Sequence, residues 1–186
     1  MLGYARTRLA LLLSAVLVTI LMSPGPALAA DAVKIDRDAN AALILLNRTT
    51  PAAARLAPQA KAILIFPSMV KAGFIVGAQH GNGALRKGGK TVAYYRMTAA
   101  SYGLQAGVQS FSYAMFLMTD AAVAYLDKSN GWEIGVGPSV VIVDAGMGKT
   151  LTTTTAKDDV YGFIFGQKGL MAGIGLQGSK ITQIDP

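Results

Sequence analysis

The chain has 186 residues, which is enough for one domain with a substantial core. It carries 17 Lys+Arg against 10 Asp+Glu, a formal net charge of +7, and it contains no cysteine. The lack of cysteine excludes disulfides and a lipidated cysteine at a cleavage site. The basic balance favours anionic partners, although ordinary solubility would also account for it.

The N-terminus predicts a secretory signal peptide. Two arginines precede the apolar run 9–22, prolines break that run, and Ala27-Leu28-Ala29 follows as a small-residue cleavage signal. We therefore expect a cleaved signal peptide over residues 1–29, a single domain over 30–186, and a periplasmic or envelope-associated protein. Removing the two arginines leaves 15 Lys+Arg against 10 Asp+Glu, a net charge of +5. An uncleaved N-terminal anchor is the alternative.

The next segment, residues 31–50, predicts a helix whose apolar side chains Val33, Ala39, Leu43 and Leu46 recur at helical spacing. Pro51 ends or bends this helix, and a short helix over 52–57 follows.

From residue 62 the apolar period changes to that of strands. We expect a buried strand over 62–66, a turn over 67–70, and a glycine-rich strand that Gly81-Asn82-Gly83 kinks or turns. Further along, the pattern predicts a turn at 86–90, a strand or connection over 91–97, and a long strand over 101–118. A helix over 120–128, capped by Thr119 or Asp120, should follow. The remaining elements expected are a strand over 131–146, a polar connection over 151–159, and two strands around 167–169.

Glycines recur at spacings of two or four residues in these strands, which places them on one face. Glycine weakens a strand unless the sheet bends there or a neighbour packs on the bare backbone. The stretch 172–178, AGIGLQG, also matches the dinucleotide fingerprint G-x-G-x-x-G. Only eight residues follow it, too few for the helix and acidic residue of a nucleotide site, so we expect another strand.

These elements predict an α+β fold. Its glycine-rich, mostly antiparallel sheet is strongly curved or forms a partly open barrel, with an N-terminal helical segment and one short internal helix.

Residue patterns typical of catalysis are weak. The stretch 144–150, DAGMGKT, imitates a P-loop, but Val143 stands where the motif needs glycine. His80 is the only histidine, and zinc would require more good ligands. Asp158 and Asp159 form an adjacent pair of carboxylates in a polar connection, which is typical of a solvated turn. We therefore expect no enzyme activity, no catalytic residue, no metal, no cofactor and no nucleotide, and the export signal argues against nucleic acid.

A basic cluster of Arg86, Lys87, Lys90 and Arg96 surrounds the flexible Gly88-Gly89. Such a turn can bring side chains and backbone N–H groups to a phosphate headgroup, and Lys34 and Arg37 add cations on the first helix. These six residues are the candidate lipid-binding site. A solvated hairpin tip is the alternative interpretation of the cluster.

Four blocks resemble the SYLF domain family: AKAILIFPSMVKAGFIVGAQHGNGAL, SYGLQAGVQSFSYAMFLMTDAAVAYL, NGWEIGVG and VYGFIFGQKGLMAGIGLQGSKI. The family includes bacterial exported proteins and eukaryotic proteins that bind phosphoinositides, some of which also bind actin. The resemblance covers roughly residues 31–181. It implies a non-enzymatic module that binds phospholipid at a membrane surface.

We do not carry the actin role over to an exported chain. The function expected is contact with anionic lipid or a membrane surface in the cell envelope, with envelope proteins as further partners. The alternative is a structural or interaction protein of the envelope whose lipid contact is incidental.

Overall fold

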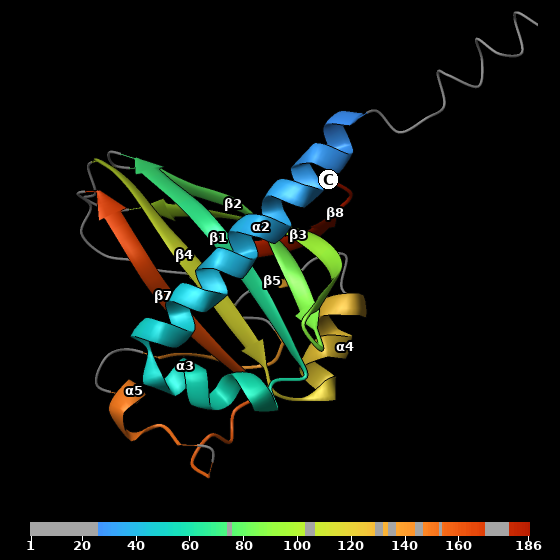
Figure 1. The fold of residues 1–186 in the computed structure, drawn as a ribbon. Helices are drawn as coiled ribbons and strands as arrows, with labels where there is room; N and C mark the ends of the chain where they lie inside the picture. Colours follow the sequence, from blue (N-terminus) through green and yellow to red (C-terminus); the bar gives the residue numbers. More distant parts are fainter. Residues whose placement is uncertain are drawn as a thin grey trace, which may run out of the picture.

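The computed structural model describes residues 26–73, 76–102, 107–128, 132–133, 137–143, 147–152, 154–169 and 179–186. Helix α2 (Pro26–Thr49) crosses one face of a sheet (Figure 1). Its buried side chains are Ile35, Ala39, Ala42 and Leu46, at spacings of four, three and four residues. Val33, which we expected in the apolar face, is 68% exposed, because it precedes that stripe by two residues, about 200° around the helix.

The helix ends where the sequence predicts. Pro51 opens a separate short helix, α3 (Pro51–Leu56), which continues into a 3-10 turn, η1 (Ala57–Gln59). A proline is tolerated at a first helical position because its missing N–H would lack an intrahelical partner there in any case.

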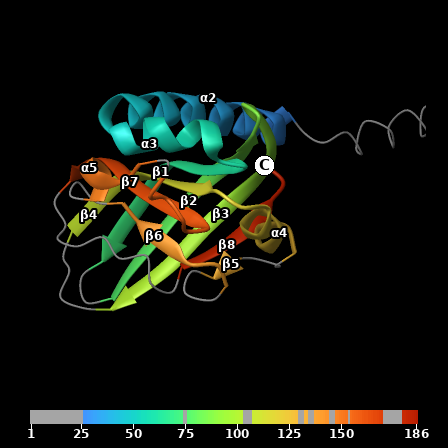
Figure 2. The same cartoon turned by 90° about the horizontal axis from the view of Figure 1, so that it is seen from below.

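The described strands form one eight-stranded sheet in the order β5-β8-β3-β2-β1-β4-β7-β6, antiparallel except for the pair β6–β7. The strands are β1 (Ala62–Gly73), β2 (Val76–Lys87), β3 (Lys90–Tyr102), β4 (Gly107–Leu117), β5 (Trp132–Glu133), β6 (Val140–Ile142), β7 (Val160–Gly169) and β8 (Ser179–Ile184). Figure 2 shows the sheet curling away from α2 and α3. The predicted α+β class with a strongly curved, mostly antiparallel sheet is thus confirmed.

The turn expected over residues 67–70 is wrong. Strand β1 runs through this segment, and its register shifts between Phe66 and Met69, which is the signature of a bulge. The bulge accommodates Pro67, whose nitrogen cannot donate to a ladder, and Ser112 donates to the Pro67 carbonyl at 2.8 Å.

The single strand expected over 131–146 is also wrong. Its two ends form β5 and β6, which lie at opposite edges of the sheet. Likewise, β7 continues through residues 167–169, and β8 pairs with β3 and β5 instead of β7. Local alternation predicts that a segment is extended, but it carries no information about which strand becomes its neighbour.

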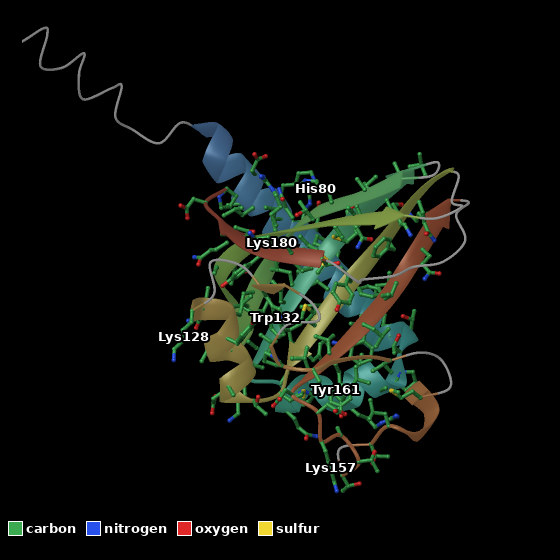
Figure 3. All side chains as sticks on the ribbon, turned by 180° about the vertical axis from the view of Figure 1, so that it is seen from behind. His80, Lys128, Trp132, Lys157, Tyr161 and Lys180 are labelled. Carbon is green, nitrogen blue, oxygen red and sulfur yellow. The ribbon has the colours of Figure 1, made fainter. Side chains whose placement is uncertain are left out.

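Two apolar cores cover the two faces of the sheet. On the outer face, α2 and α3 pack on side chains such as Ile65, Ala114 and Phe163. On the inner face, within the curve, Tyr113 and Trp132 lie among the buried side chains, and Figure 3 shows Trp132 inside the curve. The inner core also receives helix α4 (Asp120–Lys128), whose N-terminus is capped by the Thr119 hydroxyl, 3.2 Å from the Ala122 nitrogen.

Glycines on the inner face allow the close approach that the curvature requires. A Cβ at Gly83 would contact the carbonyl oxygen of Ile65 and would lie 2.6 Å from the Phe66 ring. A Cβ at Gly81 would contact the sulfur of Met69. The prediction that glycine provides room in a curved sheet is confirmed in β2, where the strand continues without a turn; the stretch 172–178 lies outside the described residues.

Candidate functional site

The predicted basic turn is the hairpin between β2 and β3. Gly88 and Gly89 have φ angles of 54° and 80°, a conformation that glycine adopts without strain. No atom lies within 4 Å of a Cβ built at either position, so the tip of the turn is open. Arg86 donates from Nη2 to the Gly89 carbonyl at 2.6 Å, which holds its guanidinium against the turn.

Lys87 is directed to the other side of the hairpin. Its ammonium lies 3.9 Å from Asp127 of α4, and its side chain is 40% exposed. A surface pair of this length contributes little to stability, but it compensates part of the positive charge of the turn.

Asp36 joins α2 to the base of the hairpin. It accepts hydrogen bonds from Thr91 at 2.7 Å and from the Tyr94 hydroxyl at 3.1 Å. Burial, followed by the hydrogen bond to Asp36, raises the pKa of Tyr94. These contacts place the N-terminal half of α2, which carries the other predicted cations, over β3.

Lys34 and Arg37 share one carboxylate. Asp38 lies 3.0 Å from the Lys34 ammonium and 2.9 Å from the Arg37 guanidinium, and their side chains are 66% and 71% exposed. The hydrogen bonds from Lys34 and then Arg37 lower the pKa of Asp38. One negative charge therefore faces two well-exposed positive charges.

A groove of about 350 Å³ lies between α2 and the strands β1 and β2. Lys34 and Asp38 line it from the helix, and Val70 and His80 line it from the sheet. Asn82 also lines the groove and accepts a hydrogen bond from Arg96 Nε at 3.1 Å, so Arg96 stands beside it. His80 is exposed on β2, as expected of a polar surface residue.

The six predicted cations therefore fall into two groups. Arg86, Lys87 and Lys90 form the hairpin cations. Lys34, Arg37 and Arg96 form the groove cations, which come from α2 and from the middle of β3. Sequence reasoning put Arg96 with the hairpin because it is close in the chain, whereas the strand carries it away to the groove.

The carboxylates singled out in the sequence have structural partners. Asp158 accepts from the Tyr161 hydroxyl at 3.1 Å, and Asp159 accepts from the Thr119 hydroxyl at 2.8 Å. Among the residues that the structure describes, no three His, Asp or Glu side chains come together as a metal site would require. The Gly148-Lys149-Thr150 of the P-loop imitation forms part of a four-residue helix, α5 (Met147–Thr150).

Sequence reasoning missed the distribution of charge. No Asp or Glu occurs between Asp38 and Asp120, while eight lysines and arginines do: Arg48, Arg55, Lys61, Lys71, Arg86, Lys87, Lys90 and Arg96. This segment forms the C-terminal part of α2, all of α3 and the strands β1–β4. A count of charge along the chain would have found it.

The described residues contain no helix that is both long enough and apolar enough to cross a bilayer. The fold and the surface together define a class of protein: an α+β domain with a curved half-barrel sheet, a helix across its outer face, and cations along the strands.

The comparison with family models identifies this domain more closely. Residues 98–185 match the Ysc84 family, described as Las17-binding protein actin regulator. This description corresponds to the SYLF family, and the match runs from the end of β3 through β8. The wider extent expected from residue 31 stays a prediction. No curated protein matches the chain.

Proposed function

We propose that the protein is exported, is not an enzyme, and binds anionic lipid headgroups at the cell envelope. The observation that carries the proposal is the segment between Asp38 and Asp120, which has eight cations and no acidic residue and supplies the four central strands. Lys71 is buried, and those of the others that lie at the surface attract anionic lipid, each contributing about 1 kcal/mol near such a membrane. The match to the SYLF family supports a binding role.

The groove cations are better placed for this contact than the hairpin cations. Lys34 and Arg37 are 66% and 71% exposed, whereas Lys87 is 40% exposed. Arg86 is also held by the turn carbonyl. Beside the groove cations lies Val70, an apolar side chain that is 46% exposed. A combination of cations and apolar area is typical of proteins that bind membrane surfaces.

The test is binding to vesicles of phosphatidylglycerol with phosphatidylcholine, compared with phosphatidylcholine alone. The wild-type protein should bind only the anionic vesicles, and its affinity should fall as salt rises, because exposed charges are screened over about 8 Å at physiological ionic strength. Replacing the three groove cations by Gln should weaken binding by roughly 3 kcal/mol, on the order of a hundredfold.

Replacing the three hairpin cations by Gln is the matched control, since it removes the same charge. We expect it to weaken binding by about tenfold, because only part of that charge is available to headgroups. Equal losses for both variants would show attraction by net charge without a site. Equal binding of the wild type to neutral and anionic vesicles would reject the proposed function and would favour an envelope interaction protein.

A further inference from the structure

Helix α2 covers only part of the outer face of the sheet. Beneath it, Ile65, Ala84 and Ala114 are fully buried. Figure 1 shows β1, β4 and β7 continuing past α2. The outer-face side chains beyond the helix are exposed, and we call the area that they form the open end: Val70, Ala72, Ala78, Ala100 and Val108.

Strand register makes the open end continuous. Ala72 of β1 pairs with Ala78 of β2 and with Val108 of β4, and Ala78 pairs with Ala100 of β3. Four exposed apolar side chains therefore stand side by side across the four central strands. Val108 is 62% exposed and Val70 is 46% exposed, which is unusual for valine on the face of a sheet.

The neighbouring row carries a cation at each end. It runs through Lys180, Thr98, His80, Val70, Ser110 and Lys168, from β8 to β7. Figure 3 shows Lys180 and His80 at the same end of the molecule. Lys168 and Lys180 are both exposed. One lysine therefore lies diagonally beyond each end of the apolar row, on β8 and on β7. The groove with its cations adjoins the open end at Val70.

Negative charge is scarce around this surface. Strands β1–β4, β7 and β8 contain no Asp or Glu within their described bounds. The carboxylates that line the adjoining groove are Asp31 and Asp38, and Asp38 is paired with Lys34 and Arg37. An exposed apolar row between cations complements an anionic lipid surface, in which acyl chains lie beneath phosphates.

We propose that the open end is the surface that enters an anionic bilayer. This inference rests on the proposed function and adds the insertion surface to it. Val70 and Val108 enter the boundary between headgroups and acyl chains, while Lys168 and Lys180 remain at the level of the phosphates. A second copy of the chain fits less well, because a symmetric contact through the open end would bring lysines of the same charge together.

The natural absence of cysteine allows a direct test. Val108→Cys, labelled with a dye that reports polarity, should shift to bluer emission when vesicles of phosphatidylglycerol with phosphatidylcholine are added. Lipids that carry a quencher in the acyl chain should quench it. Val92→Cys is the matched control, because Val92 is a valine near the hairpin that is 53% exposed. The emission and quenching of a dye at position 92 should change little when vesicles are added.

A second variant tests the energetic role of the valines. Val70→Thr with Val108→Thr keeps β-branched side chains on the strands and removes apolar area, so the fold should persist. Affinity for the anionic vesicles should fall about tenfold, from the area that the two partly exposed valines would otherwise bury.

The outcomes separate the two proposals. If the wild type binds anionic vesicles but the dye at position 108 does not respond and the threonine variant binds equally, the inference is overturned and the proposed function stands. If the wild type does not bind anionic vesicles, both the proposed function and this inference are rejected. A dye at position 108 that shifts with protein concentration in the absence of lipid would assign the open end to self-association and would also overturn the inference.

Discussion

Asp38 is the residue that limits the positive charge of the groove cations. It accepts from both Lys34 and Arg37, and its pKa is lowered by them, in that order. A carboxyl whose folded pKa lies below the unfolded value contributes stability above the unfolded pKa and loses it as pH falls through the folded one. The group therefore stays ionised at neutral pH, and it competes with a lipid phosphate for the same two cations.

Replacing Asp38 by Asn should increase the affinity for anionic vesicles by about fivefold, since the removal of one negative charge near the surface corresponds to about 1 kcal/mol. Stability should change little, because surface ion pairs of this kind contribute modestly. The measurement is vesicle binding at low salt. Asp120→Asn, a change of the same charge at the start of α4, is the control and should leave affinity unchanged; an equal increase in both variants would remove Asp38 from the site.

At the scale of elements, β1 and β2 combine a bulge with glycines. The register of β1 shifts against β2 between Ile65 and Val70, and a Cβ at Gly81 or Gly83 of β2 would collide with β1 at this bulge. The bulge and the glycines together let the sheet curl, and the curl leaves an inner face for Trp132 and an outer face for α2. The bulge also contributes to the groove, because Pro67 and Ser68 form part of its lining.

Gly83→Ala should lower the free energy of unfolding by about 1–3 kcal/mol, because its Cβ would collide with the backbone oxygen of Ile65. Urea unfolding measures the change. Gly148→Ala is the matched control: its Cβ would lie 3.7 Å from Val143 and 3.9 Å from Ala52, in ordinary contact. That variant should be neutral or more stable by up to about 1 kcal/mol. An unchanged midpoint for Gly83→Ala would refute the close-approach argument.

At the scale of the whole molecule, the basic part is the centre of the sheet. Taken together, strands β1–β4, β7 and β8 contain Lys and Arg and no Asp or Glu within their described bounds. Helix α2 carries both signs, whereas Asp120, Asp127, Asp158 and Asp159 lie on α4 and in the connection before β7. Such an asymmetric charge distribution orients a protein at an anionic surface. It also agrees with a contact through the outer face, where both the groove and the open end lie.

The proposed export adds a prediction about the N-terminus. Signal cleavage after Ala29 would leave a chain that begins Ala30-Asp31 and would remove the first turn of α2, which begins at Pro26. The buried residues of the helix start only at Ile35, so its packing should persist. Intact mass of the protein from the native envelope fraction checks this, and a mass that retains residues 1–29 would indicate an anchor.

The sequence by itself determined the local features of this protein. Helical spacing located α2 and the break at Pro51, the polar cap located α4, and paired glycines located the hairpin turn, because each depends on neighbours within a few residues. Four blocks in order also predicted the family, which the match over residues 98–185 confirmed. The basic turn was also predicted, because its glycines and cations are neighbours in the chain.

The tertiary structure alone decided which distant residues share a surface. Arg96 stands at the groove with Lys34, and Val70, Val108, Lys168 and Lys180 come together from four strands. Strand order and register are set by packing across the whole sheet, and a bulge such as that after Phe66 moves every later side chain of β1 relative to its neighbours. Alternation along one strand cannot carry that information, because it says which side chains share a face but not which strand lies beside it.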